Sequence, residues 1–230
     1  MTLVFEPLAD DALLLRFGSV IEPIHNARAL AVAQRLRELQ PPWLRDTVPA
    51  YASLAVFFDC DRIDDADPHA FVAAALRRCL DAITDMAATP ARIIDIPVCY
   101  DSGMGPDLAE AASELGLSAE ELIHRHCSTD YSVAMIGFAP GFPYLLGLPE
   151  SLALPRLATP RTRVPAGSVA IGGNQAGIYP RESPGGWRLL GRTPLLLFDP
   201  ARAVPSLLAP GDRVRFQRID LAAFERMALS

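Results

Sequence analysis

The sequence contains no lysine, so all 21 of its cationic side chains are arginine. This absence excludes enzymes that form a Schiff base on lysine and carrier domains that hold biotin or lipoyl on lysine. It also excludes a nucleotide-binding loop in which a lysine contacts the phosphates. Arginine cannot replace lysine as a nucleophile, because it keeps its proton in proteins. If ATP takes part in the function, its phosphates must meet arginine, backbone N–H groups or residues of a partner.

Cysteine is scarce. The four cysteines, Cys60, Cys79, Cys99 and Cys127, lie far apart and form no CxxC pair. This spacing matches neither a metal site nor a disulfide framework. The first three occupy apolar patterns, which predicts core positions for them. A nucleophilic role for one of them is the less favoured alternative.

A membrane-spanning run and an excess of positive charge are also absent. No apolar run is long enough to cross a bilayer, although 50% of the residues are hydrophobic. The N-terminal stretch, MTLVFEPLADDALLL, lacks the basic segment and the small-residue cleavage site of a signal peptide. We therefore expect a cytoplasmic protein. The net charge of −6 argues against a general nucleic-acid binder.

The first hundred residues alternate between strand and helix patterns. Apolar residues recur with helical spacing from Asn26, a candidate N-cap, to Leu39, and a second helix follows Asp67 with Pro68 in its first position. Strands are predicted at Ala12–Gly18, Asp46–Tyr51, Ser53–Asp59 and Arg92–Tyr100. The order β-α-β-β-α-β is that of a ferredoxin-like α/β domain, which we place at residues 1–95.

The pattern changes near residue 95. Two short helices are predicted at about 107–115 and 118–127, the second starting with the capping box of Ser118 and Glu121. From Tyr131 onward, short strand patterns alternate with turn signals, which is typical of an all-β barrel or sandwich. We therefore expect an α+β chain whose second domain, residues 96–230, is mainly β.

The segment from Gly137 to Pro194 has the most unusual composition. It holds ten of the fifteen glycines and nine of the twenty-one prolines, so its backbone needs special torsions at many points. It carries six arginines against two glutamates. This pattern predicts a scaffold that presents cations to a small anionic ligand. The alternative is a β domain with many tight turns and arginines that point to water.

Three side chains are the candidates for catalysis. His126 ends a predicted helix, where the charged form of histidine is favoured, and is the best acid–base candidate. Arg161 and Arg163 lie two residues apart, so in an extended segment they form a clamp for a carboxylate or phosphate. The alternatives are a structural histidine and two solvated arginines.

A wider group of residues is predicted to bind the ligand. The SPGGW turn lets the backbone approach a ligand closely, or is only a tight turn with a buried tryptophan. The aromatic side chains form a wall of the groove or, alternatively, ordinary core or a face for a partner subunit. The predicted binding residues are Phe138, Phe142, Tyr144, Asn174, Gln175, Tyr179, Arg181, Ser183, Gly185, Gly186 and Trp187. We expect no metal site.

Three long motifs in this region resemble those of a known family. They are GFAPGFPYL (Gly137–Leu145), PRLATPRTRVPAGSVAIGG (Pro155–Gly173) and YPRESPGGWRLLGRTP (Tyr179–Pro194). They are similar to the signature of the allophanate hydrolase subunit 1 (KipI) family, which includes the PxpB-type proteins of 5-oxoprolinase. GPDLAE, LSAEELIHRH and PGDRVRF also resemble family positions. Asp101 and Ser102 depart from the family pattern in the loop before GPDL.

The resemblance implies a fold and a set of partners. The fold is a small α/β domain followed by a cyclophilin-like β-barrel, with His126 at the position of a family histidine. The partners are a homologous subunit of the KipA or PxpC type and a PxpA-type subunit. Together they would use ATP, with Mg²⁺ bound jointly with a partner, to open 5-oxo-L-proline to L-glutamate. The resemblance also leaves open an inhibitor of a sensor histidine kinase and a component of urea or allophanate degradation.

Overall fold

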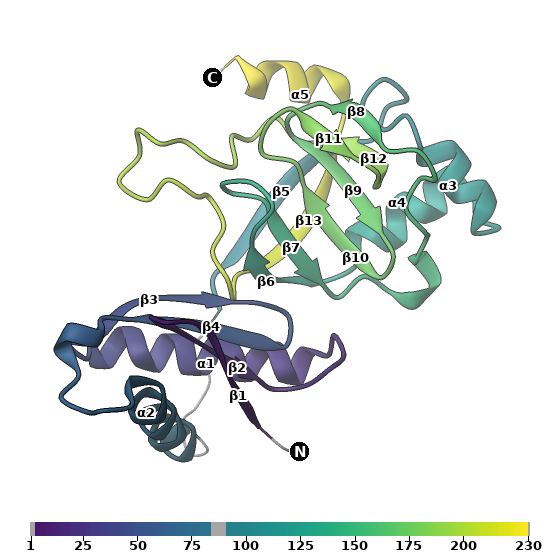
Figure 1. Ribbon diagram of the computed structural model, residues 1–230. Helices are drawn as coiled ribbons and strands as arrows, with labels where there is room; N and C mark the ends of the chain where they lie inside the picture. The colour runs from purple at the N-terminus through teal and green to yellow at the C-terminus, as the bar shows by residue number, and fades with distance from the viewer. Residues whose placement is uncertain (1–2, 84–90, 230) are drawn as a thin grey trace. The chain divides into compact units, whose positions relative to one another are not determined.

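The computed structural model describes residues 3–83 and 91–229, and the chain divides into two compact units, Met1–Pro90 and Ala91–Ser230 (Figure 1). No helix within the described residues is both long and apolar enough to cross a bilayer.

The N-terminal unit is a four-stranded antiparallel sheet with two helices on one face (Figure 1). Its strand order is β1-β2-β4-β3. The elements are β1 (Val4–Ala9), β2 (Ala12–Arg16), α1 (Pro23–Leu39), β3 (Leu44–Pro49), β4 (Ser53–Phe58), the 3₁₀ turn η1 (Cys60–Arg62) and α2 (Pro68–Ile83). Leu54, Val56 and Phe58 alternate along β4 and are fully buried beneath the helices, as the period of a half-covered strand requires.

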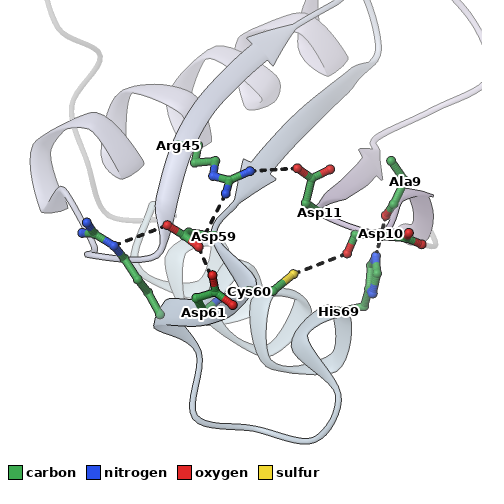
Figure 2. A network of polar contacts seen from close by, with 9 residues as sticks. Ala9, Asp10, Asp11, Arg45, Asp59, Cys60, Asp61 and His69 are labelled. Carbon is green, nitrogen blue, oxygen red and sulfur yellow. Dashed lines mark hydrogen bonds and ion pairs between the residues drawn. The ribbon is translucent and has the colours of Figure 1, made fainter.

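Polar contacts fasten one end of this sheet (Figure 2). Arg45 at the start of β3 contacts Asp11 of the β1–β2 turn at 2.9 Å and Asp59 at 3.5 Å. His69 of α2 lies 2.9 Å from the carbonyl oxygen of Ala9. The thiol of Cys60 donates to the carbonyl of Asp10. Cys60 is half-buried and packs at the edge of the core, whereas Cys79 and Cys99 are buried as the sequence predicts.

Two predictions for this unit fail. The strand predicted at 92–100 is β5 (Ile93–Cys99), which pairs with strands of the second unit, so the N-terminal order is β-β-α-β-β-α and the ferredoxin-like domain is not confirmed. A boundary at residue 95 would fall inside this strand.

Asn26 is not an N-cap either: α1 starts at Pro23, and the Asn26 side chain donates to the carbonyl of Ala50.

The C-terminal unit is built on a closed barrel of seven strands, as the second half of the sequence predicts. The strand order is β10-β7-β6-β13-β5-β12-β9. The barrel strands are β5, β6 (Tyr131–Ile136), β7 (Pro143–Leu146), β9 (Ser168–Gly172), β10 (Gln175–Ile178), β12 (Arg188–Arg192) and β13 (Arg213–Ile219). Outside the barrel are α3 (Leu108–Glu114), α4 (Ala119–Cys127), η2 (Glu150–Leu152), the β8–β11 pair (Arg161–Val164 and Ser183–Gly185) and α5 (Leu221–Ala228).

The barrel strands have two faces with different contents. One buried cluster takes residues from all seven strands, including Ile171 of β9 and Ala176 of β10, so it fills the barrel interior. Their neighbours Ala170 and Gly177 point the opposite way, to the outside. A second cluster, which contains most of the aromatic residues of the Gly137–Pro194 segment, packs on that outer face.

One glycine fixes how the loop before α3 docks on the barrel. A Cβ atom at Gly105 would lie 2.0 Å from the carbonyl oxygen of Leu190, whereas a Cβ at Gly103, in the same loop, would meet nothing within 4 Å. The carbonyl belongs to β12 and cannot move without disturbing the barrel.

We therefore expect Gly105→Ala to lower the free energy of unfolding by about 1–3 kcal/mol through this overlap. Gly103→Ala, the matched control, should stay within about 0.5 kcal/mol of the parent protein. Urea unfolding followed by near-ultraviolet circular dichroism measures both. Equal midpoints for the two variants would show that the loop does not dock on β12 as described.

Candidate functional site

Five aromatic side chains gather on the outer face of the barrel over β7, β9 and β10. We call Phe138, Phe142, Tyr144, Tyr179 and Trp187 the aromatic cluster. The ring centroid of Phe142 lies 4.9 Å from that of Tyr144, 5.2 Å from that of Tyr179 and 5.8 Å from that of Trp187. The rings meet edge to face or tilted, which is the favourable arrangement of aromatic pairs. All five belong to the predicted ligand-binding set.

Glycines make room for the larger rings. A Cβ atom at Gly172 of β9 would lie 2.8 Å from the indole of Trp187, and one at Gly177 of β10 would lie 3.0 Å from it. A Cβ at Gly185 would lie 2.3 Å from the phenol oxygen of Tyr179. Much of the glycine content of this segment is therefore explained by aromatic rings that pack directly on backbone.

Phe138 is the exposed member of the cluster and its backbone is strained. Its φ is +65°, and the N–H of Ala139 donates to the carbonyl of Gly137 at 2.7 Å across it. A hydrogen bond of this span with a positive φ at the centre is a γ-turn of the rare, strained kind. The turn holds the Phe138 ring 60% exposed with its edge against Phe142 and Tyr179. Strain of this sort is often kept at binding sites.

Two arginines border the aromatic cluster. The guanidinium of Arg156 lies 5.6 Å from the ring centroid of Trp187, a cation–π distance. Burial raises the pKa of the Tyr179 phenol, and the charges of Arg156 and Arg161 oppose this shift, so both guanidinium groups act on the same phenol. The cluster therefore offers ring faces beside positive charge.

Arg161 is held by a buried carboxylate. Its Nη2 contacts Asp107 Oδ1 at 2.5 Å, while Asp107 Oδ2 accepts the backbone N–H of Leu189 at 2.7 Å. Asp107 is only 3% exposed. The other terminal nitrogen of Arg161, Nη1, is buried and has no hydrogen-bond partner among the described residues.

The predicted clamp of Arg161 and Arg163 is not present. Arg163 forms two 2.9 Å hydrogen bonds to Glu182 on the surface, whereas Arg161 pairs with Asp107, so each guanidinium group is engaged by a different carboxylate. Arg188 contacts Glu110 and Glu114 of α3 instead. Two of the six arginines of the segment, rather than all of them, therefore border the aromatic cluster, because intramolecular carboxylates or backbone carbonyls engage most of the others.

His126 lies in the core rather than in a site. Its side chain is fully buried, with Nδ1 2.8 Å from the hydroxyl of Tyr100 and its ring stacked on Phe216 at 4.5 Å. Burial lowers the pKa of His126 to about 3, so the expectation that the helix end favours its charged form is wrong. A neutral ring without solvent access does not support the predicted acid–base role.

The remaining predicted residues lie around the cluster or apart from it. Asn174 is exposed in the two-residue turn between β9 and β10, which Gln175 follows, and Arg181 is exposed. Ser183 has a buried hydroxyl without a hydrogen-bond partner among the described residues. The carbonyl of Gly186 accepts the N–H of Leu157 at 2.7 Å. The structure gives no contact between the aromatic cluster and the side chains of Asn174, Gln175, Arg181 or Ser183 among the described residues.

Sequence reasoning missed Asp107 and did not choose Arg156. The GPDLAE motif contains Asp107, and its resemblance to family positions was the available signal. Arg156 was one arginine among six, and only the distance to Trp187 separates it from the others. In the part of the chain that the structure describes, no group of three or more His, Cys, Asp or Glu side chains could hold a metal ion.

Comparisons with known proteins cover almost the whole chain. The family model described as the carboxyltransferase domain, subdomain C and D, matches residues 3–208. The B subunit of 5-oxoprolinase from Bacillus subtilis (strain 168) is 42% identical over 220 residues, which are 93% of this chain and 92% of that protein. The B subunit of 5-oxoprolinase from Escherichia coli O157:H7 is 41% identical over 211 residues, 91% of this chain and 93% of that protein.

Solved structures show the same fold inside longer chains. TTHA0988, in a crystal of space group P6522, is 43% identical with a TM-score of 0.77 over 91% of this chain, which spans 40% of that chain. The urea amidolyase of K. lactis is 19% identical with a TM-score of 0.73 over 97% of this chain, which spans 15% of that chain. The second likeness shows the fold alone.

The buried His126 makes stability depend on pH. Its pKa is about 3 in the folded state and 6.5 ordinarily, so between these values the unfolded chain binds a proton that the folded chain does not. The contribution of His126 to the free energy of unfolding is fully present above pH 6.5. It is lost as the pH is lowered toward 3, by about 1.4 kcal/mol per pH unit.

Urea unfolding at about pH 7.5 and about pH 5.0 should therefore show a loss of roughly 2 kcal/mol from this group. The loss should disappear in His126→Phe and remain in His124→Gln, a control at an exposed histidine of the same helix. The same pH dependence in His126→Phe and in the parent protein would contradict the assignment.

Proposed function

Since the chain belongs to the family of the carboxyltransferase domain, subdomain C and D, together with the B subunits of 5-oxoprolinase, we propose that it is the corresponding component of an ATP-dependent 5-oxoprolinase. In this role it acts with partner subunits to open 5-oxo-L-proline to L-glutamate. The observation that carries the proposal is the match at 42% identity over 93% of this chain, which extends over both compact units.

The need for partners is supported by the longer relative and by the site itself. This chain spans 40% of TTHA0988, so in that protein the corresponding part is joined to a further, larger part. We propose that a separate subunit of the KipA or PxpC type takes the place of that part here, and that a PxpA-type subunit completes the enzyme. The aromatic cluster fits this division, because it offers ring faces beside positive charge, while His126, the predicted base, is buried in the core.

The aromatic cluster suits the chemistry of the proposed substrate. 5-Oxo-L-proline is a small lactam ring that carries one carboxylate. The ring can lie against the exposed edge of Phe138, while the guanidinium of Arg156 attracts the carboxylate. The positive charge of Arg161 acts on the Tyr179 phenol of the same cluster. These contacts hold the ligand and its developing negative charge without taking part in bond breaking.

ATP and Mg²⁺ have no obvious binding residues in the described part of this chain. No acidic or histidine cluster there could hold the metal, and the sequence has no lysine for a phosphate loop. We therefore assign phosphoryl transfer and activation of water to the partner subunits. In the overall reaction, ATP and two water molecules are consumed, the lactam C–N bond is cleaved, and glutamate, ADP and phosphate are released.

The alternatives receive less support. A urea- or allophanate-degrading role rests on relatives of 19% identity, which share the fold only. A kinase inhibitor would need no carboxylate-binding arginine beside the aromatic cluster, and the relatives of 41–42% identity carry the name of an enzyme subunit.

Reconstitution tests the proposal. This chain is mixed with its PxpC-type and PxpA-type partners from the same organism, ATP, Mg²⁺ and 5-oxo-L-proline, and glutamate and ADP are measured. We expect both products in equal amounts from the full mixture, and no glutamate from this chain alone. If the mixture without this chain makes glutamate at the same rate, the proposed function is wrong.

The binding site has its own test in the reconstituted enzyme. Arg156→Gln should raise the KM for 5-oxo-L-proline about tenfold with little change in kcat, because a ground-state contact to the carboxylate is lost. Arg163→Gln removes the same charge from a surface ion pair and should leave KM unchanged. Truncating Arg161 is a poorer test, because it leaves the buried Asp107 carboxylate unpaired. Equal KM values for the two variants would show that the substrate binds elsewhere. The proposed function would still stand, because it is tested separately by the reconstitution.

A further inference from the structure

The N-terminal unit contains an open cavity of about 260 Å³ between α1 and α2. We call it the helix cavity, and its lining consists of Arg35, Leu36, Leu39, Pro41, Trp43, Ala75, Arg78, Cys79 and Ala82. Neither the aromatic cluster nor any residue of the predicted site contributes to it.

The sequence creates this space by pairing small residues with large ones. Ala75, Cys79 and Ala82 are spaced four and three residues apart, so they lie on one face of α2. The opposite wall carries Leu36 of α1 and the indole of Trp43. The three small side chains on α2 leave space at this place that larger side chains would fill. Leu36 is 1% and Trp43 is 6% exposed, so they close the base of the cavity. Its accessible apolar surface comes from Leu39, Pro41, Ala75 and Ala82.

The cavity combines apolar walls with positive charge. Arg35 and Arg78 line it from opposite helices, and no Asp or Glu is among the described residues of its lining. Arg35 has a loose contact to Glu38 at 3.6 Å. Arg78 is exposed and makes no hydrogen bond or ion pair with another described residue. Arg35 and Arg78 therefore both carry charge at the cavity, and only Arg35 has a carboxylate near it among the described residues.

Both charges also act on the thiol of Cys79, which lines the cavity. Burial raises the pKa of Cys79, and the charges of Arg35 and Arg78 act against that shift. Each guanidinium group is therefore close enough to the Cys79 sulfur to favour a negative charge there. A carboxylate at the mouth of the cavity would meet the same two cations.

We propose that the helix cavity binds a monocarboxylate with an apolar body, the carboxylate between Arg35 and Arg78 and the body against Leu39, Pro41 and Ala75. At about 30 Å³ per water-sized group, the volume admits on the order of eight or nine non-hydrogen atoms. An aliphatic acid of six to eight carbons fits this size, with its head group at the rim. A small polar acid would not use the walls, and an uncharged chain would not use the arginines.

Titration calorimetry with sodium octanoate, below its micelle concentration, tests the proposal on the full chain. We expect one site with a Kd on the order of 100 µM. Octylammonium and acetate, which lack the negative charge and the apolar body respectively, should bind at least tenfold more weakly. No heat of binding from octanoate, or equal binding of octanoate and octylammonium, would overturn the proposal.

Paired variants locate the site. Arg78→Gln should weaken octanoate binding roughly tenfold. Its neighbour Arg77 stacks on Phe5 at 4.4 Å and does not line the cavity, so Arg77→Gln should bind as the parent does. Ala75→Leu should abolish binding by filling the cavity, whereas Ala74→Leu, one residue away and outside the lining, should not. Circular dichroism checks that each variant is folded.

One further control separates this site from the aromatic cluster. Arg156→Gln should leave octanoate binding unchanged, because Arg156 lies on Trp187 in the other compact unit. Octanoate binding that is lost in Arg156→Gln and kept in Arg78→Gln would place the acid at the aromatic cluster and refute the cavity site.

Discussion

The carboxylate of Asp107 joins three segments that are far apart in the sequence. It lies just before α3, accepts the N–H of Leu189 in β12 and pairs with Arg161 in β8. Taking a carboxylate out of water costs several kcal/mol. The hydrogen bond from Leu189 and the ion pair with Arg161 offset that cost, and both need the three segments to lie together. Arg161 faces Gly185 across the β8–β11 pair, and Gly185 lies against the phenol of Tyr179. The position of the aromatic cluster therefore depends on a charge that the cluster does not contain.

A chain without lysine uses arginine for structure as well as for binding. The planar guanidinium group forms two parallel hydrogen bonds, as between Arg163 and Glu182, or bridges a carboxylate and a carbonyl, as Arg92 does with Asp212 and Leu207. These pairs engage most of the positive charge within the molecule. What is left for ligands is small and local, which suits a subunit that supplies part of a site and relies on others for the remaining groups.

Sequence patterns predicted the parts of this fold that depend on neighbouring residues. The strand and turn signals after Tyr131 indicated a barrel or a sandwich, and the structure has the barrel. The glycine-rich motifs drew attention to the five rings, which pack together. The patterns could not show that β5 pairs with β13, since its apolar residues fit either unit. They could not show that Arg161 meets Asp107, 54 residues away. His126 was misjudged because a helix-end argument applies at the surface, whereas burial dominates in the core.

The pairing of β5 with β13 has a consequence for synthesis on the ribosome. These two strands are the first and the last of the barrel, and their parallel ladder runs from Ile93 and Arg213 to Cys99 and Ile219. The ring of strands cannot close until residue 219 has left the exit tunnel. The N-terminal sheet is complete by Phe58 and can form early from contacts that are close in sequence. During the interval the nascent barrel has open strand edges, which makes this the stage at which the growing chain most needs protection from aggregation.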